Sequence, residues 1–198
     1  MKTVTGLFDN YENARSAVSK LETAGISHDD ISIVSNNSDG RYKDENNAAE
    51  GAGTGAGVGA AVGGAGGLLT GLGLLAIPGV GPVVAAGWLA ATAVGAVAGA
   101  AVGGATGGII GALTDSGVPE ADAHVYAEGV RRGGTLVTAR VDEPRVAEAE
   151  SILKGNSPVD PAVRRTAYEQ QGWKGFDATL DPYGPDKIAE ERNRYPLV

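Results

Sequence analysis

The segment that decides how this chain is organised runs from Gly51 to Thr114 and reads GAGTGAGVGAAVGGAGGLLTGLGLLAIPGVGPVVAAGWLAATAVGAVAGAAVGGATGGIIGALT. These 64 residues contain no ionisable side chain, and they hold 21 of the chain's 32 glycines. The flanking sequence is acidic, since residues 1–50 and residues 115–198 each carry a net charge of -4. An uncharged run of this length exceeds an ordinary core element of a globular domain.

Glycines recur in this segment every four residues, in two series. Positions four apart lie along one stripe of an α-helix. Between the series, the sequence IPGVGP at residues 77–82 is expected to end one helix and to begin another. We therefore predict helices over residues 51–76 and 83–113, joined by a turn at Pro78, Gly79, Gly81 and Pro82. The predicted helix-packing positions are Gly51, Gly55, Gly59, Gly63, Gly67, Gly71, Gly95, Gly99, Gly103, Gly107 and Gly111.

The glycines also favour a particular solvent for this hairpin. Glycine inside a helix costs about 0.8–1.0 kcal/mol relative to alanine, so the whole zipper costs on the order of 10 kcal/mol in water, as much as a domain's stability. In a bilayer the segment must be helical in spite of its glycines, because the backbone N–H and C=O groups find no water there to form hydrogen bonds with. At about 1.5 Å per residue, both helices could cross about 30 Å of hydrocarbon. We therefore expect two transmembrane helices that pack through their glycines.

Two other interpretations of the hairpin stay open. Residues 51–67 hold only Val58 and Val62 as strongly apolar side chains, and the flanks show no clear Lys/Arg excess to set an orientation. The first alternative buries the zipper between the subunits of a soluble oligomer. The second is a disordered Gly/Ala segment.

The sequence on either side of the uncharged block predicts mixed α and β structure. We expect strands over residues 3–8, 31–35 and 135–141, and helices over residues 11–24, 120–132 and 144–154. The sequence VTGLFD at 4–9 lines up with VTARVD at 137–142, and each copy is followed by a helix. Two such units can share one small sheet with helices on one face, as in ferredoxin-like folds.

The predicted fold class is therefore α+β: a small split ferredoxin-like αβ domain that is interrupted by a Gly/Ala-rich helical hairpin. The predicted boundaries are 1–36 for the strand–helix–strand half, 37–50 for a polar linker, 51–114 for the glycine-zipper hairpin, 115–160 for the helix–strand–helix half and 161–198 for a tail. The tail combines prolines with spaced aromatic residues, which suits docking on its own domain or on a protein partner.

Several motifs resemble those of bacterial stress proteins. The sequence GLGLLAIPGVGPV at 71–83, GVPE at 117–120 and RRGG at 131–134 are similar to the low-temperature-induced proteins of cyanobacteria. The N-terminal unit resembles the heat-induced general stress proteins. The resemblance covers residues 1–155; it implies stress-linked expression and membrane association, and it brings no catalytic residues.

Composition and motifs exclude several kinds of chemistry. The chain has no Cys and a net charge of -8, which disfavours thiol catalysis, Cys-ligated metals and nucleic-acid binding. The Gly-rich block has no Lys, so it holds no phosphate-binding loop of the GxxxxGK[ST] type. His28 and His124 lie far apart without ligand spacing, so no metal or other cofactor is expected. Arg131 and Arg132 are expected at a helix C-terminus, with contact to lipid phosphate as a second interpretation.

These observations favour a non-enzymatic stress-response protein. The expected partners are membrane lipid and further copies of the chain, with no nucleic acid and with a protein partner for the tail. The start Met1–Val4 lacks the features of a signal peptide, which favours the bacterial inner membrane with both termini cytoplasmic. The alternatives are a cytoplasmic soluble oligomer that buries the hairpin between subunits, and a small-ligand or regulatory binding module.

Overall fold

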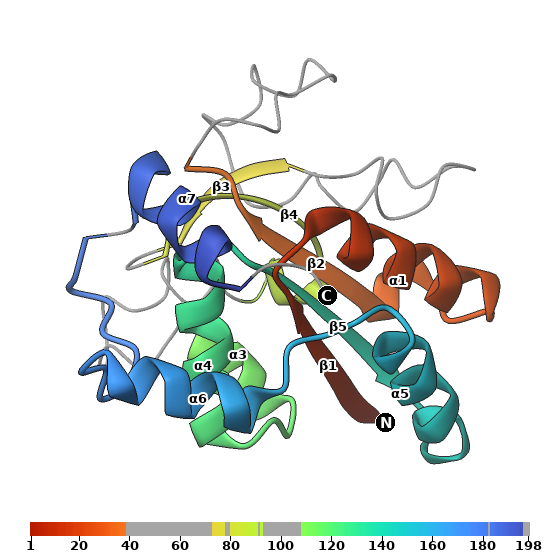
Figure 1. Ribbon diagram of the computed structural model, residues 1–198. Helices are drawn as coiled ribbons and strands as arrows, with labels where there is room; N and C mark the ends of the chain where they lie inside the picture. Colours follow the sequence, from red (N-terminus) through yellow and green to blue (C-terminus); the bar gives the residue numbers. More distant parts are fainter. Residues whose placement is uncertain (39–72, 78–79, 91, 93–107, 182, 196–198) are drawn as a thin grey trace, which may run out of the picture.

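A computed structural model describes residues 1–38, 73–77, 80–90, 92, 108–181 and 183–195 (Figure 1). The strands are β1 (Lys2–Phe8), β2 (Ile31–Asn36), β3 (Gly73–Ile77), β4 (Gly81–Gly87) and β5 (Thr135–Val141). The helices are α1 (Tyr11–Thr23), α3 (Ile109–Asp115), α4 (Glu120–Arg131), α5 (Val146–Lys154), α6 (Pro161–Gln170) and α7 (Pro185–Arg194), with short 3₁₀ turns at His28–Asp30 and Glu143–Arg145.

All five strands form one antiparallel sheet in the order β1-β5-β2-β4-β3. The strand β5, which follows the uncharged block, lies between β1 and β2, which precede it. Thr138 illustrates the register, because its Cα is paired with Thr5 of β1 on one side and with Ser32 of β2 on the other. The two halves of the chain therefore meet in the same sheet, and the structure is α+β as expected.

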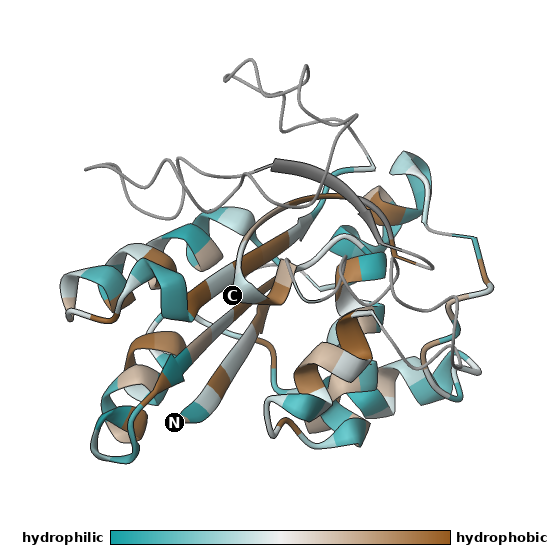
Figure 2. Ribbon diagram, turned by 180° about the vertical axis from the view of Figure 1, so that it is seen from behind, coloured by the Kyte–Doolittle hydropathy of each residue, from teal (hydrophilic) through white to brown (hydrophobic). Residues whose placement is uncertain are grey.

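Helices cover both faces of this sheet, whereas the sequence predicted a single covered face (Figure 1). On one face α1 and α5 pack against apolar residues that include Val4, Phe8, Ile33 and Val137. On the other face α3 and α4 pack against residues that include Leu7, Val34, Val83 and Leu136. Because side chains alternate along a strand, each central strand supplies residues to both clusters. The colours of Figure 2 show brown strands enclosed by helices whose outer surfaces are teal.

Secondary structure in residues 1–36 and 120–154 follows the predictions within one or two residues. The expected strands over 3–8, 31–35 and 135–141 are β1, β2 and β5, and the expected helices are α1, α4 and α5. Asn10 caps α1, since its side chain accepts a hydrogen bond from the N–H of Glu12 at 2.7 Å. These elements could be predicted because their apolar periodicity is local.

The prediction of helix at residues 73–76 and 83–87 is wrong, because both segments are strands. They pair with each other as an antiparallel hairpin, with Ile77 opposite Gly81, and β4 also pairs with β2. The Pro/Gly sequence therefore separates two strands, not two helices. The sheet supplies the hydrogen bonds, and the adjacent valines Val83 and Val84 are β-branched, which favours a strand.

Gly87 shows why β4 ends where it does. Its φ of +90° suits glycine, and a Cβ at this position would collide with the carbonyl oxygen of Ile31. The chain leaves the sheet at this residue, and a short helical stretch begins at Trp88.

The glycine zipper falls mostly outside the described residues. That holds for Gly51, Gly55, Gly59, Gly63, Gly67, Gly71, Gly95, Gly99, Gly103 and Gly107, and also for the turn residues Pro78 and Gly79. Of the zipper positions, Gly111 is described; it lies in α3, which packs against α4. Within the part of the chain that the structure describes, none of the helices combines the length and the apolar character that crossing a membrane requires.

Candidate functional site

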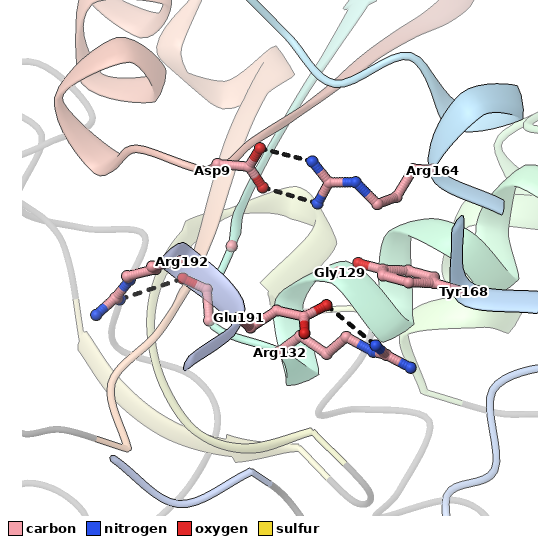
Figure 3. A pocket seen from close by; sticks show the side chains of 9 residues that line it. Asp9, Gly129, Arg132, Arg164, Tyr168, Glu191 and Arg192 are labelled. Atoms are coloured by element: carbon pink, nitrogen blue, oxygen red, sulfur yellow. Dashed lines mark hydrogen bonds and ion pairs between the residues drawn. The ribbon is translucent and has the colours of Figure 1, made fainter. Parts of the chain in front are cut away.

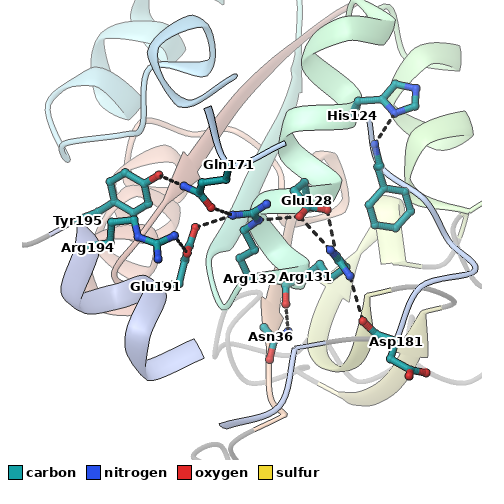
Figure 4. Close-up of polar contacts among 11 residues, drawn as sticks. Asn36, His124, Glu128, Arg131, Arg132, Gln171, Asp181, Glu191, Arg194 and Tyr195 are labelled. Carbon is teal, nitrogen blue, oxygen red and sulfur yellow. Dashed lines mark hydrogen bonds and ion pairs between the residues drawn. The ribbon is translucent and has the colours of Figure 1, made fainter. Parts of the chain in front are cut away.

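A cluster of charged and aromatic side chains surrounds the C-terminal end of α4, where it meets the C-terminal tail (Figure 4). Its centre is Glu128, which is only 1% exposed. The Glu128 carboxylate accepts hydrogen bonds from Arg131, at 3.0 and 3.1 Å, and from Nε of Arg132 at 2.6 Å. Residues three and four positions apart share one side of a helix, which explains this pairing. Both arginines are 6% exposed, so the carboxylate neutralises charge that water does not reach.

The tail contributes further partners to both arginines. Arg132 donates to Gln171 at 2.6 Å and to Glu191 at 3.0 Å, and its guanidinium lies 4.0 Å from the centre of the Tyr168 ring. Arg131 donates to the carbonyl oxygen of Asp181 at 2.9 Å. These contacts join α6, α7 and the segment between them to the C-terminal end of α4 (Figure 4).

A second ion pair ties the tail to the first strand (Figure 3). Arg164 of α6 donates two parallel hydrogen bonds to Asp9, at 2.8 and 2.6 Å, and Asp9 directly follows β1. This bidentate geometry is the strongest arrangement of a guanidinium and a carboxylate. The Tyr195 ring lies over the same guanidinium at 3.7 Å.

Apolar and backbone contacts complete the docking of the tail. The N–H of Val159 donates to the carbonyl oxygen of Leu7 at 2.7 Å, which is an isolated antiparallel bridge to β1. Ile188 of α7 is fully buried against Gly133, where an added Cβ would lie 2.5 Å from the isoleucine side chain. The tail therefore packs on its own domain.

Tyr168 is the largest fully buried side chain of the cluster. Burial raises the pKa of its hydroxyl, although Arg164 opposes the rise. This hydroxyl has no hydrogen-bond partner among the described residues. The cavity beside it measures about 10 Å³, which is room for about one water molecule. A groove of about 160 Å³ on the outer side of the Asp9–Arg164 pair is lined partly by Val163 and Tyr195.

We call this cluster the clasp, because it holds the tail against the domain. It comprises Asp9, Glu128, Arg131, Arg132, Arg164, Tyr168 and Glu191. Each of its carboxylates, Asp9, Glu128 and Glu191, is paired with at least one arginine. It contains no nucleophile held by a base, which is the arrangement that covalent catalysis requires. Within the described ranges, no three His, Asp or Glu side chains are grouped so that they could hold a metal ion.

The residues singled out from the sequence have the following places. Arg131 and Arg132 lie at the C-terminal end of α4, as expected, but they are buried and paired, so contact with lipid phosphate stays a prediction that this burial does not favour. Gly81 and Pro82 begin β4. Nδ1 of His124 accepts a hydrogen bond from the N–H of Phe176 at 3.1 Å, and its Nε2 lies 3.9 Å from the Glu120 carboxylate.

Sequence reasoning missed Glu128, Asp9 and Arg164 as members of one cluster. The spacing of Glu128 before the two arginines is a readable signal, because it places all three on one side of a helix. The pairing of Asp9 with Arg164 joins residues 155 positions apart, and no local pattern indicates it.

Comparison with known proteins identifies the N-terminal part of the chain. Residues 3–77 match the family model of the heat-induced stress protein YflT domain. The match starts within β1 and ends at the last residue of β3, so it includes the first strand of the hairpin. No curated protein and no solved structure matches the chain. The similarity of residues 71–83 and 117–134 to low-temperature-induced proteins stays a prediction. The similarity to the heat-induced stress protein YflT domain therefore covers 75 of the 198 residues, from β1 to β3.

Proposed function

We propose that this chain is a non-enzymatic stress-response protein that assembles with further copies of itself through the hairpin β3–β4. The stress-response part rests on the YflT domain. The self-assembly part rests on one observation: β3 is the last strand of the sheet, and its sequence GLLAI carries no charge.

An uncharged outer strand presents unpaired N–H and C=O groups that a second strand can bind, and proteins usually protect such edges with charge or coverage. The other edge of this sheet is protected in this way. There β1 carries Lys2, paired with Glu143, and Val159 bridges to Leu7. The outer edge of β3 has no strand partner among the described residues. We therefore place the hairpin between subunits and not in lipid, since the described part of it is β-sheet.

We also propose that the core of the sheet is a ferredoxin-like unit. The helix α1 connects β1 to β2, with β5 between these two strands, and α5 follows β5 on the same face as α1. The bridge of Val159 to Leu7 takes the place of a fourth strand beside β1. The helices α3 and α4 form an additional layer on the opposite face.

The absence of enzymatic activity is proposed from the clasp, whose charges are paired and whose cavity has room for about one water molecule. Such a cluster fixes the tail in place. The proposed role of the tail is therefore to hold the domain rigid while the hairpin mediates assembly.

The test is sedimentation velocity of the full chain over a range of concentrations. We compare the native sequence with Ala76→Lys, which places a charge on β3, and with Ser19→Lys, which adds the same charge at an exposed position of α1. The native chain and the Ser19 variant should form the same discrete oligomer, and the Ala76 variant should shift toward monomer. A native chain that is monomeric throughout, or an Ala76 variant that assembles normally, contradicts the proposal.

A further inference from the structure

The sheet ends at β1 on one side and at β3 on the other, and these two edges differ in how open they are. At β1, the N–H of Val159 donates to the carbonyl oxygen of Leu7 at 2.7 Å, and Lys2 pairs with Glu143 at 3.5 Å. At β3, the described residues supply no further strand, and the sequence GLLAI supplies no charge. A strand from another molecule therefore meets an obstacle at β1 and meets none of that kind among the described residues at β3.

The two faces of the sheet are less suitable for contact with a second sheet. The helices α1 and α5 cover one face of β1, β5 and β2, and α3 and α4 cover the other face (Figure 1). The backbone N–H and C=O groups along an edge, in contrast, are satisfied by the backbone of another strand. The contact that this architecture favours is therefore edge to edge.

We propose that β3 of one copy pairs with β3 of a second copy, antiparallel and around a two-fold axis that passes beside Leu75. This inference rests on the proposed assembly through the hairpin β3–β4 and specifies its geometry. Pairing of β3 with β1 of the next copy would require the protected edge of β1 to open, and it would leave one β3 edge free at the end of every open row of molecules. Pairing of β3 with itself uses both open edges at once.

Symmetry determines the register of this pairing. A two-fold axis makes the two strands antiparallel, and it makes one residue face the same residue of the other copy. An axis beside Leu75, the middle of the strand, pairs all five residues: Leu75 with Leu75, Leu74 with Ala76 and Gly73 with Ile77. The two five-stranded sheets then join into one sheet that has the protected β1 at both ends. No open edge is left among the described strands, so the assembly stops at two chains.

Single cysteines in the full chain test this geometry, because the native chain has no Cys. Directly opposite residues of neighbouring strands lie within disulfide range, so Leu75→Cys should give a covalent dimer under mild oxidation. Gly73→Cys alone should not, because its two cysteines would lie four residues apart along the strand, about 13 Å. A mixture of Gly73→Cys and Ile77→Cys chains should give crosslinked dimers that contain one chain of each kind. This mixture also decides the matter if Leu75→Cys does not fold.

The control for random collision is Ser19→Cys, at an exposed position of α1, which should crosslink no faster than Gly73→Cys. Sedimentation equilibrium of the native chain should give twice the chain mass of 19.8 kDa. A native chain that stays monomeric would overturn both this pairing and the proposed assembly. The pairing alone is overturned by an oligomer of three or more chains that Ala76→Lys dissociates, by equal crosslinking of Leu75→Cys and Ser19→Cys, or by a mixture that crosslinks no better than Gly73→Cys alone.

Discussion

Replacing Glu128 by glutamine removes the negative charge at the centre of the clasp with almost no change in side-chain volume. The carboxylate is 1% exposed and accepts three hydrogen bonds from Arg131 and Arg132. Removing one partner of a buried ion pair costs about 3–5 kcal/mol, because the other charge stays buried without compensation. Arg132 keeps its bonds to Glu191 and Gln171, so we expect the lower end of this range, about 3 kcal/mol.

The assay is urea unfolding of the full chain, followed by circular dichroism and by tryptophan fluorescence. The quantity measured is the free energy of unfolding, which should fall by about 3 kcal/mol. In a thermal scan the same loss would lower the midpoint by about 6–12 °C for a chain of this size. Glu120→Gln is the matched control, because the same substitution falls on an exposed residue at the start of the same helix and should cost less than about 1 kcal/mol. A Glu128 variant that unfolds within about 0.5 kcal/mol of the native chain would refute the argument that the clasp holds the tail.

Three further predictions concern the clasp and its surroundings. Gly133→Ala should destabilise the chain by about 1–3 kcal/mol in the same unfolding assay, because φ is +106° and α7 leaves no room for a Cβ. The control is Gly184→Ala, which should be neutral or stabilising, because φ is −77° there and a Cβ would lie in open space. Asp9→Asn should cost about 1–3 kcal/mol and make α6 more sensitive to limited proteolysis, because the bidentate pair with Arg164 is lost. Burial, reinforced by a nearby carboxylate, raises the pKa of Tyr126 to about 12, so this tyrosine ionises in the unfolded chain first. The difference in pKa contributes about 2–3 kcal/mol to the free energy of unfolding below pH 10, and this contribution should be lost as the pH rises from 10 to 12. In Tyr126→Phe the free energy of unfolding should therefore fall less over this pH range.

Much of the α/β framework could be predicted from the sequence, because its signals are local. Alternating residues define β1, and Ala14, Ala17, Val18 and Leu21 form the buried side of α1 at helical spacing. The similarity of residues 4–9 and 137–142 also predicted two equivalent units. These units do share one sheet, in which β1 and β5 are neighbours.

The hairpin at residues 73–87 could not be predicted in the same way. The four-residue glycine spacing indicated helices, and that pattern was extended into residues that lack it. The outcome there depends on β2, whose Asn36 pairs with Val83, some fifty residues away in sequence. Tertiary pairing of this kind overrides a local pattern, particularly in a glycine-rich segment with weak propensity of its own.

The clasp was partly readable from the sequence. The positions of Glu128, Arg131 and Arg132 are set by helix geometry, and only their burial required the structure. The burial comes from α6 and α7. The tail contained enough aromatic residues to predict docking, but which face it covers depends on distant pairs such as Asp9 with Arg164.

The central claim is that the uncharged segment contributes a β-hairpin to the sheet that β1, β2 and β5 form, since the proposed assembly depends on it. Because the chain has no cysteine, a single engineered disulfide tests this claim. Val34→Cys is combined with Ala85→Cys, its Cα partner across β2 and β4, or with Val83→Cys, which lies diagonally on the same face. Directly opposite residues come within disulfide range, whereas diagonal ones lie beyond it. Under mild oxidation, mass spectrometry should detect the loss of two hydrogens rapidly in the first pair and not in the second; equal rates, or no crosslink in either, would contradict the account.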